Sequence, residues 1–261
     1  MNDRTMLVTG ATGVLGREIL RRAHETGCPV RALTRRTTPP DLPGATGTDW
    51  RTGDLVTNVG LDTALIGVDT VIHCASDPRR PKDDLPAFRH LLDAARRAGV
   101  RHIVNISIVG IDQVPLKYYR VKLEVERLLA ESGLGWTNLR ATQFPQLLDG
   151  MLTTLARLPV LPMLAGTPCQ PVHPAEVADR LITLALGQPV GHAPDFGGPE
   201  IHPSTELAAS WLRATHPRRR RVLPVHLPGR LGTALRQGHL TTPAHPDGTT
   251  TWSDYLATRR A

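Results

Sequence analysis

The sequence predicts an α/β protein built on a doubly wound parallel sheet, with a smaller region towards its C-terminal side. Three observations carry this prediction. Short apolar runs alternate with amphipathic helical patterns in the first half of the 261-residue chain. A glycine-rich turn, GATGVLG, joins the first apolar run to the first helical pattern. Beyond residue 142 prolines become frequent and the alternation loosens. Strands that alternate with helices form a parallel sheet that is covered on both faces.

Each element follows from the spacing of its apolar residues and from glycine and proline at its ends. Strands are expected at 5–10, 29–35, 69–76, 100–107 and 136–142, with a short one within 49–55. Helices are expected at 13–27, 61–67, 85–99 and 118–133, and near 144–157, 174–187, 203–215 and 228–238. The segments 37–48 and 77–84 are interpreted as loops.

Composition and charge exclude several classes of protein. The formal net charge is +7, but arginine is spread along the chain and aromatic residues make up only 4%. The one dense run, Arg218 to Arg221, is interpreted as a solvated loop face rather than a nucleic-acid site. The sequence shows no signal-peptide layout and no membrane-spanning run. Its three cysteines are far apart, which predicts neither disulfides nor a metal site and favours a cytoplasmic location.

The turn GATGVLG has the composition of a dinucleotide-binding loop. It places glycine at positions 10, 13 and 16, between a predicted strand and a predicted helix, which is the context that such a motif requires. A tight turn followed by free backbone N–H groups at a helix N-terminus binds pyrophosphate. We therefore expect residues 1–142 to be a dinucleotide-binding core. The candidate cofactor contacts in this loop are Gly10, Thr12, Gly13, Val14, Leu15 and Gly16.

The end of the second strand predicts which dinucleotide binds. Enzymes that prefer NAD usually carry an acidic residue there for the ribose hydroxyls. Here the chain reads Thr34-Arg35-Arg36, and the nearest acid, Asp41, lies beyond two prolines. A guanidinium can make paired, charge-assisted hydrogen bonds to a 2′-phosphate. The sequence thus predicts NADP(H), with Arg35 as the main phosphate contact. The alternative is two solvated arginines in an arginine-rich chain.

A tyrosine and a lysine share one face of the helix expected at 118–133. The chain has only three lysines, and Lys122 lies four residues after Tyr118. Both continue an apolar stripe through Val125 and Leu129, because residues i and i+4 lie on the same face. A buried ammonium needs a partner, and a cofactor ribose and a phenol would supply one. The lysine would also lower the pKa of the tyrosine, which suits proton transfer.

At this point the sequence resembles a known family. GATGVLG, TGDL (52–55), NIS at the end of the fifth strand and Tyr118-x-x-x-Lys122 resemble the short-chain dehydrogenase/reductase superfamily, which has a Rossmann-like fold. VNISIVGID, YYRVKLEVERLL and LRATQF resemble its atypical, NmrA-like branch of NAD(P)H-binding proteins. The likeness is good over residues 5–185 and loose beyond them.

The resemblance implies further site residues by position. Asp54 and Leu55 would lie beside the adenine. Cys74, Ala75 and Ser76 would follow the cofactor ribose. Ala141, Thr142 and Phe144 would border the nicotinamide. Ser107 stands where the family has its active-site hydroxyl, but only ten residues, including Pro115, separate it from Tyr118. A hydroxyl satisfied within the strand end is therefore an equal alternative for Ser107.

Together these features predict a reductase. NADPH would deliver hydride to a carbonyl or similar polarised double bond of a small, mostly apolar molecule, with Tyr118, Lys122 and Ser107 as catalytic residues. Residues 143–261 are expected to form a substrate-binding or capping region, interleaved with the core in one globular unit. A non-catalytic NAD(P)H sensor, and an epimerase or dehydratase on the same fold, remain alternatives. No nucleic-acid or membrane partner is expected, and a homodimer is left open. His73, in an apolar strand, is expected to be a core residue.

Overall fold

The structure is a computed structural model that describes residues 5–37, 42, 47–215 and 220–259. Two sequence features lie wholly or partly outside these residues. Asp41 is one, and the run Arg218 to Arg221 is the other, since only its last two arginines are described. Across the described ranges, no helix combines the length and the apolar character that crossing a membrane requires.

The described chain folds into two compact units. The first comprises residues up to Ser107 together with 120–139 and 174–193, and the second comprises 108–119, 140–173 and the residues from Pro194 onwards. The units are therefore not separated by a single cut in the sequence, because the chain returns to the first unit at Pro174. The proposed division into a core at 1–142 and a capping region at 143–261 stays a prediction.

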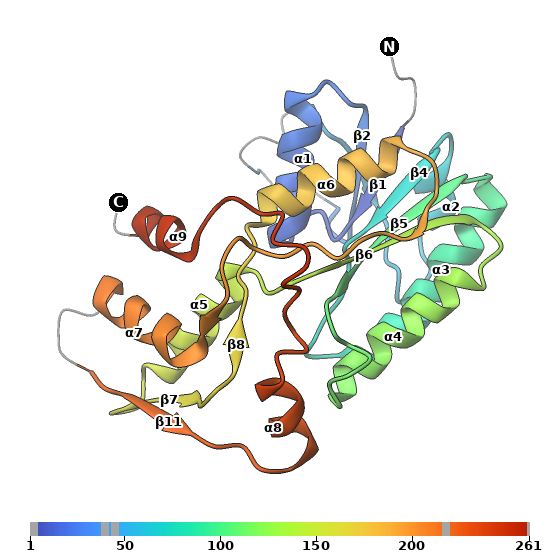
Figure 1. Cartoon of the computed structure of the whole chain (residues 1–261). Coiled ribbons are helices and arrows are strands. Elements are labelled where there is room, and N and C mark those ends of the chain that lie inside the picture. The colour runs from blue at the N-terminus through green and yellow to red at the C-terminus, as the bar shows by residue number, and fades with distance from the viewer. Residues whose placement is uncertain (1–4, 38–41, 43–46, 216–219, 260–261) are drawn as a thin grey trace. The chain divides into compact units, whose positions relative to one another are not determined.

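The first unit is built around a seven-stranded sheet, which confirms the predicted doubly wound class (Figure 1). Its strand order is β3-β2-β1-β4-β5-β6-β9. Pairing is parallel for β1 with β2 and β4, for β2 with β3, for β4 with β5 and for β6 with β9. The strands are β1 (Met6–Thr9), β2 (Val30–Thr34), β3 (Asp49–Thr52), β4 (Thr70–His73), β5 (His102–Ile108), β6 (Gly135–Ala141) and β9 (Gly191–His192).

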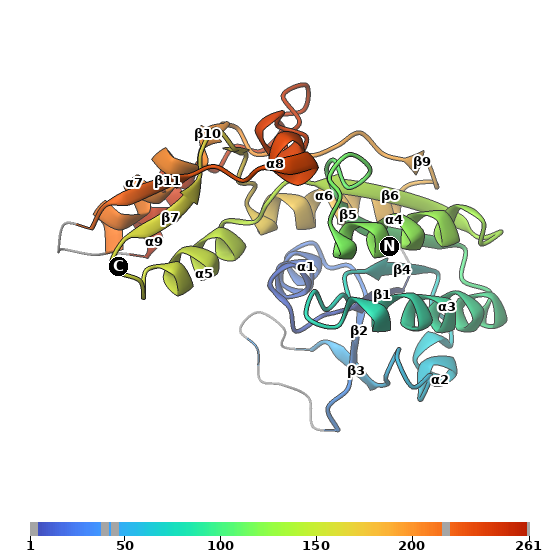
Figure 2. The same ribbon diagram turned by 90° about the horizontal axis from the view of Figure 1, so that it is seen from below.

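The order of the strands decides which helices cover which face. From β1 the chain moves outward to β2 and β3, and then returns to β4 and moves the other way to β5 and β6. Right-handed crossovers in opposite directions place their helices on opposite faces. Accordingly α1 (Val14–Glu25) packs with α6 (Pro174–Leu186), whereas α2 (Leu61–Leu65), α3 (Pro81–Ala98) and α4 (Lys117–Ala130) lie on the other side (Figures 1 and 2).

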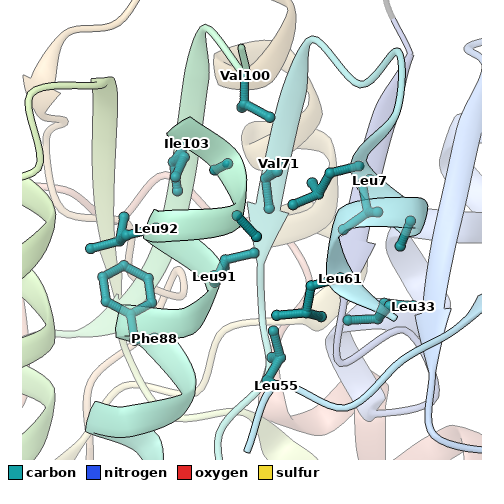
Figure 3. Close-up of a cluster of buried hydrophobic side chains, with 14 of the residues drawn as sticks. Leu7, Leu33, Leu55, Leu61, Val71, Phe88, Leu91, Leu92, Val100 and Ile103 are labelled. Carbon is teal, nitrogen blue, oxygen red and sulfur yellow. The ribbon is translucent and has the colours of Figure 1, made fainter. Parts of the chain in front are cut away.

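Strand alternation builds the core beneath α2, α3 and α4 (Figure 3). Leu7 of β1 pairs with Val71 of β4, which pairs with Ile103 of β5, so all three point to the same face. They meet Phe88 and Leu91 from α3, which are at most 1% exposed. Each such side chain contributes about 1.5–3 kcal/mol of hydrophobic stabilisation. This core fixes the carboxyl ends of the strands, where the candidate site lies.

Most predicted elements are present, but one boundary is wrong in an informative way. The segment 77–84 was expected to be a loop, whereas α3 begins at Pro81. Proline is favoured in the first helical turn, and Asp83 and Asp84 favour the positive end of the helix dipole. The helix therefore starts four residues earlier than its apolar stripe, and it carries two carboxylates to the strand ends.

The second unit has its own core, in which two tryptophans are buried. Trp211 is 1% and Trp252 is 3% exposed, and their indole N–H groups donate to Asp149 at 2.5 Å and to Ser210 at 2.9 Å. Strand β7 (Leu161–Leu164) pairs with β11 (Val222–Val225), and β8 (Pro168–Cys169) pairs with β10 (His202–Pro203). The helices are α5 (Pro145–Leu155), α7 (Ser204–Thr215), α8 (Gly229–Arg236) and α9 (Trp252–Thr258). The four short strands and α9 were not predicted.

Candidate active site

The glycine turn follows β1 at the point where the strand order reverses, which is where ligands bind in open α/β sheets. Gly10 has a φ of +67°, a conformation that favours glycine. A Cβ atom at this position would lie 2.8 Å from the backbone of Cys74 and Ala75. The fold itself therefore requires glycine at position 10, whether or not a ligand is bound.

The structure constrains the other two glycines of the turn, Gly16 and Gly13, in different ways. A Cβ atom at Gly16 would lie 2.3 Å from the Gly10 carbonyl oxygen, so Gly16 lets the start of α1 pack against the turn that precedes it. Gly13 is the N-cap of α1, with a φ of −75° that any residue can adopt. Its Cβ atom would meet only the Gly10 oxygen, at 3.2 Å. The fold constrains Gly13 least of the three glycines, and its role as a ligand contact stays a prediction.

A pocket of about 390 Å³ opens at these strand ends within the first unit. It is lined by the glycine turn, by the residues that follow β2, β3 and β4, and by the start of α3. Nine of the predicted cofactor contacts line it: Gly10, Thr12, Gly13, Arg35, Asp54, Leu55, Cys74, Ala75 and Ser76. Three others lie in the first turn of α1 outside this lining: Val14 is 47% exposed, and Leu15 and Gly16 are buried. The pocket brings together segments that are distant in the sequence.

Two adjacent arginines stand at the end of β2. The backbone there is held in place, since the Gly53 N–H donates to the Thr34 carbonyl at 2.9 Å and the Arg36 N–H to the Thr34 hydroxyl at 3.2 Å. Arg35 and Arg36 are exposed and line the pocket. Among the described residues, neither guanidinium has a hydrogen-bond or ion-pair partner. Arg36 thus joins the predicted Arg35 as a cation available to an anionic ligand.

The end of β4 is fixed by hydrogen bonds to β1 on one side and to α3 on the other. The Thr9 hydroxyl accepts from the Cys74 and Ala75 N–H groups at 3.2 and 3.3 Å. The Ser76 hydroxyl donates to Asp84 at 2.5 Å. Burial raises the pKa of the Cys74 thiol to about 12, so this thiol stays protonated. The pocket wall also includes Asp83 and Asp84, which sequence reasoning missed because it placed them in a loop.

Lys122 is buried on α4, as the sequence predicts, but its partner is a backbone carbonyl. Its side chain is 4% exposed, and Nζ donates to the Ile106 oxygen of β5 at 3.0 Å. Burial lowers the pKa of Lys122, while the charges of Asp84 and Glu126 raise it. The adjoining Ser107 is 2% exposed, and its hydroxyl has no hydrogen-bond partner among the residues that the structure describes. A buried hydroxyl in this state is available to a ligand.

The remaining predicted residues belong to the second unit. Tyr118 precedes Lys122 by one helical turn on the continuous helix α4, and its ring lies 6.1 Å from that of Tyr119. Ala141 is buried, and the Thr142 N–H donates to the Phe196 carbonyl at 3.1 Å. Phe144 is the N-cap of α5. The roles of these residues stay predictions.

Comparison with known proteins identifies the family. The model of the NAD(P)H-binding family matches residues 10–179. A reductase from Streptomyces griseus, named (4-alkanoyl-5-oxo-2,5-dihydrofuran-3-yl)methyl phosphate reductase, is 33% identical over 218 residues, which cover 80% of this chain and 73% of the relative. The photosystem II assembly factor Ycf39 of Cyanophora paradoxa is 35% identical over 156 residues, 56% of this chain and 47% of the relative.

The fold is also found in solved structures. The NADPH-dependent quinone oxidoreductase of Escherichia coli, in complex with NADPH, aligns with a TM-score of 0.80 over 97% of this chain and 99% of the other, at 22% identity. This chain belongs to the NAD(P)H-binding family, which confirms the predicted resemblance at the level of that family, and it shares its fold with the solved structure. The matches support a nicotinamide dinucleotide as cofactor and a general oxidoreductase role.

Proposed function

We propose that this chain is an NADPH-dependent reductase of a carbonyl or similar polarised double bond. One observation carries the proposal: the pocket at the switch point combines the glycine turn with two arginines that have no partner among the described residues. The turn and the first turn of α1 would hold the pyrophosphate, and Arg35 with Arg36 would hold the 2′-phosphate. A bound reduced nicotinamide supplies the hydride.

The chain's own residues would supply the proton and the orientation. Tyr118 would donate a proton to the substrate oxygen, or to the atom that becomes negative as the hydride adds. The positive charge of Lys122 would favour the phenolate form of Tyr118 after transfer. Ser107 would donate its hydrogen bond to the substrate oxygen, a role that its unpartnered hydroxyl supports.

A calorimetric titration of the purified protein with NADPH, and separately with NADH, tests the cofactor assignment. We expect NADPH to bind more tightly by tenfold or more, since paired charge-assisted hydrogen bonds to one phosphate are worth more than about 1.4 kcal/mol. The variant Arg35→Gln should lose most of this difference and keep the affinity for NADH. Equal affinities for both dinucleotides in the unsubstituted protein would refute the assignment.

The substrate class can be approached through the Streptomyces griseus reductase. Its name describes an oxo-dihydrofuran that carries an alkanoyl chain and a phosphate, which agrees with a small molecule that is partly apolar. We propose compounds of this class, simple quinones and aromatic aldehydes as the first substrates to assay. Oxidation of NADPH is followed by absorbance, and product formation confirms that the electrons reach the substrate.

A second candidate function is regulation or assembly of another protein. The similarity to Ycf39, a photosystem II assembly factor, favours it, although the match covers about half of each chain. In this case NADPH would bind without turnover, and a partner protein would be captured only with one redox form of the dinucleotide. Turnover of any of the substrates above, abolished by Tyr118→Phe, would favour the reductase instead.

A further inference from the structure

A row of polar side chains is buried between α4 and strands β5 and β6. Its members are Lys122 and Glu126 on α4, Asn138 on β6 and Asn105 on β5. Each is at most 4% exposed. Buried polar side chains are costly unless they form hydrogen bonds, and buried charges, such as a carboxylate or an ammonium group, are the most costly. Glu126 therefore needs an explanation that the binding of a dinucleotide alone does not give.

Hydrogen bonds connect three of the four side chains, and a separate bond fixes Lys122. The Asn105 amide donates to the Asn138 oxygen at 2.7 Å, and the Asn138 amide donates to Glu126 at 3.0 Å. The next residue of β5, Ile106, accepts from the Lys122 ammonium at 3.0 Å. These bonds thus run from β5 through β6 to Glu126 of α4, and the separate Lys122 bond joins α4 to β5 at the residue after Asn105. Together they hold the carboxylate of Glu126 and the ammonium of Lys122 on the same side of the sheet.

Glu126 lies four residues after Lys122, so the two side chains share a helix face. A lysine followed by a glutamate is the less favourable order for an exposed pair on an isolated helix. Stabilisation of the helix therefore does not explain the pair. The charged and titratable groups that act on Lys122 are Glu126 from its own helix, Asp84 from α3, and Cys74 and His73 from the end of β4. Glu126 and Asp84 are the carboxylates among these groups.

We propose that Glu126 is a positioning residue, which Asn138 and Asn105 orient so that its carboxylate keeps the buried Lys122 ammonium charged and bonded to the Ile106 carbonyl. The consequence for catalysis rests on the proposed function. Ser107 follows Ile106 directly, so a shift of Lys122 would also change the backbone that presents the Ser107 hydroxyl. Glu126 itself would touch neither substrate nor cofactor.

The protonation of Lys122 can be measured directly because the chain has only three lysines. Protein labelled with ¹³C at the lysine ε carbon gives three signals, which Lys82→Arg and Lys117→Arg assign. Lys82 and Lys117 are exposed and serve as internal references. The variant Glu126→Gln keeps the size of the side chain and an oxygen that can accept from Asn138, but it removes the charge. We expect the acid dissociation constant of Lys122 to rise at least threefold, because a compensating charge is lost from a buried site.

A matched control removes the same charge directly after the end of the helix, which is at Ala130. Glu131 is 58% exposed and pairs with Arg127, so Glu131→Gln should leave the Lys122 titration unchanged. A Lys122 titration in Glu126→Gln that equals that of the unsubstituted protein would overturn the proposal. If Glu126→Gln does not fold, Glu126→Asp decides, because it keeps the charge but withdraws it by one methylene. A higher acid dissociation constant for Lys122 would then support the proposal, and an unchanged one would overturn it.

These measurements need neither substrate nor cofactor, so they stand apart from the proposed function. Once a substrate is known, the alkaline limb of the rate profile should move to lower pH in Glu126→Gln, while the affinity for NADPH at neutral pH stays the same. A protein that turns over no substrate but shows the Lys122 shift would refute the reductase and leave the role of Glu126 intact. If the protein turns over a substrate but the Lys122 titration is the same in Glu126→Gln, the role of Glu126 is refuted and the reductase stands.

Discussion

At the scale of single residues, the glycines of the turn separate the needs of the fold from the needs of a ligand. We predict that Gly13→Ala lowers the melting temperature by only a few degrees, because its φ of −75° suits any residue and the one tight contact of the new Cβ atom, 3.2 Å to the Gly10 oxygen, is relieved by a shift of a few tenths of an ångström. The same methyl group should weaken NADPH binding by tenfold or more, since it obstructs the approach of a pyrophosphate to the turn. Thermal unfolding and calorimetry measure the two effects.

A second glycine provides the comparison. Gly10→Ala should destabilise the fold strongly, because its methyl group would lie 2.8 Å from the backbone of Cys74. Gly133 has a similar φ, +73°, but nothing lies within 4 Å of its position, so Gly133→Ala reports the cost of the backbone conformation alone. If Gly13→Ala unfolds the protein as Gly10→Ala does, Gly13 is structural and the ligand argument fails.

His73 predicts a loss of stability in acid. Burial first, and the Lys122 charge second, lower the pKa of His73 to about 3. The unfolded imidazole binds its proton near pH 6.5, whereas the folded one does so only near pH 3. The free energy of unfolding therefore has its full value above pH 6.5, and it decreases by up to a few kcal/mol as the pH falls towards 3. Urea unfolding between pH 4 and 7 measures this slope.

The variant His73→Asn isolates that contribution. Asparagine can keep a hydrogen bond to Thr9, which lies 2.9 Å from His73 Nδ1, but it cannot bind a proton in this range. It should be less stable at pH 7, because the ring contact with Phe88 is lost. Its stability should nevertheless fall less steeply with acid. The control is His226→Asn at an exposed position, and equal slopes in all three proteins would contradict the prediction.

At the scale of elements, helix α4 presents Tyr118 and Lys122 one turn apart. We expect Tyr118→Phe to lose turnover by about a hundredfold or more, because general acid catalysis contributes this much. Its affinity for NADPH should not change. Tyr119→Phe is the matched control, since Tyr119 is the adjacent residue and burial raises its pKa to about 12. If Tyr119→Phe loses turnover and Tyr118→Phe keeps it, the proton donor is Tyr119 and not Tyr118.

Elements with a strong periodic pattern could be predicted from the sequence, and those made by tertiary contacts could not. The apolar runs identified six strands of the sheet, and GATGVLG identified the turn at the switch point. Strand β9 has only two residues and exists because Thr137 and Asn138 pair with it. The partner of Lys122 could not be predicted, because it is a backbone carbonyl of β5 and every residue has one. Asp84 was assigned to a loop because α3 begins at Pro81, before the start of the apolar stripe that predicted the helix.

At the scale of the whole molecule, the cations behind the net charge of +7 are mostly arginines, and several of them pair with carboxylates that are close in the sequence. Arg21 pairs with Glu18 and Glu25, and Arg127 pairs with Glu124 and Glu131, all within one or two helical turns. Exposed pairs of this kind contribute at most about 1 kcal/mol each. Arg35 and Arg36 differ because they line the pocket and have no partner within the described chain, whereas Arg80, which also lines it, pairs with Asp77 and Asp83. They thus stand out from the general arginine content.

The salt dependence of binding distinguishes the effect of the net positive charge from the effect of Arg35 and Arg36. The net charge attracts NADPH and NADH alike, whereas Arg35 and Arg36 act on the extra phosphate of NADPH. Both arginines are exposed, so salt screens them over a length of about 10 Å at 0.1 M and 3 Å at 1 M. We predict that the ratio of the NADH to the NADPH dissociation constant falls severalfold between about 0.05 and 0.5 M salt, as the screening length shortens. In Arg35→Gln the ratio should start lower and change less. A ratio that stays constant with salt in the unsubstituted protein would mean that any preference for NADPH comes from shape or neutral hydrogen bonds, and the two arginines would lose their assigned role.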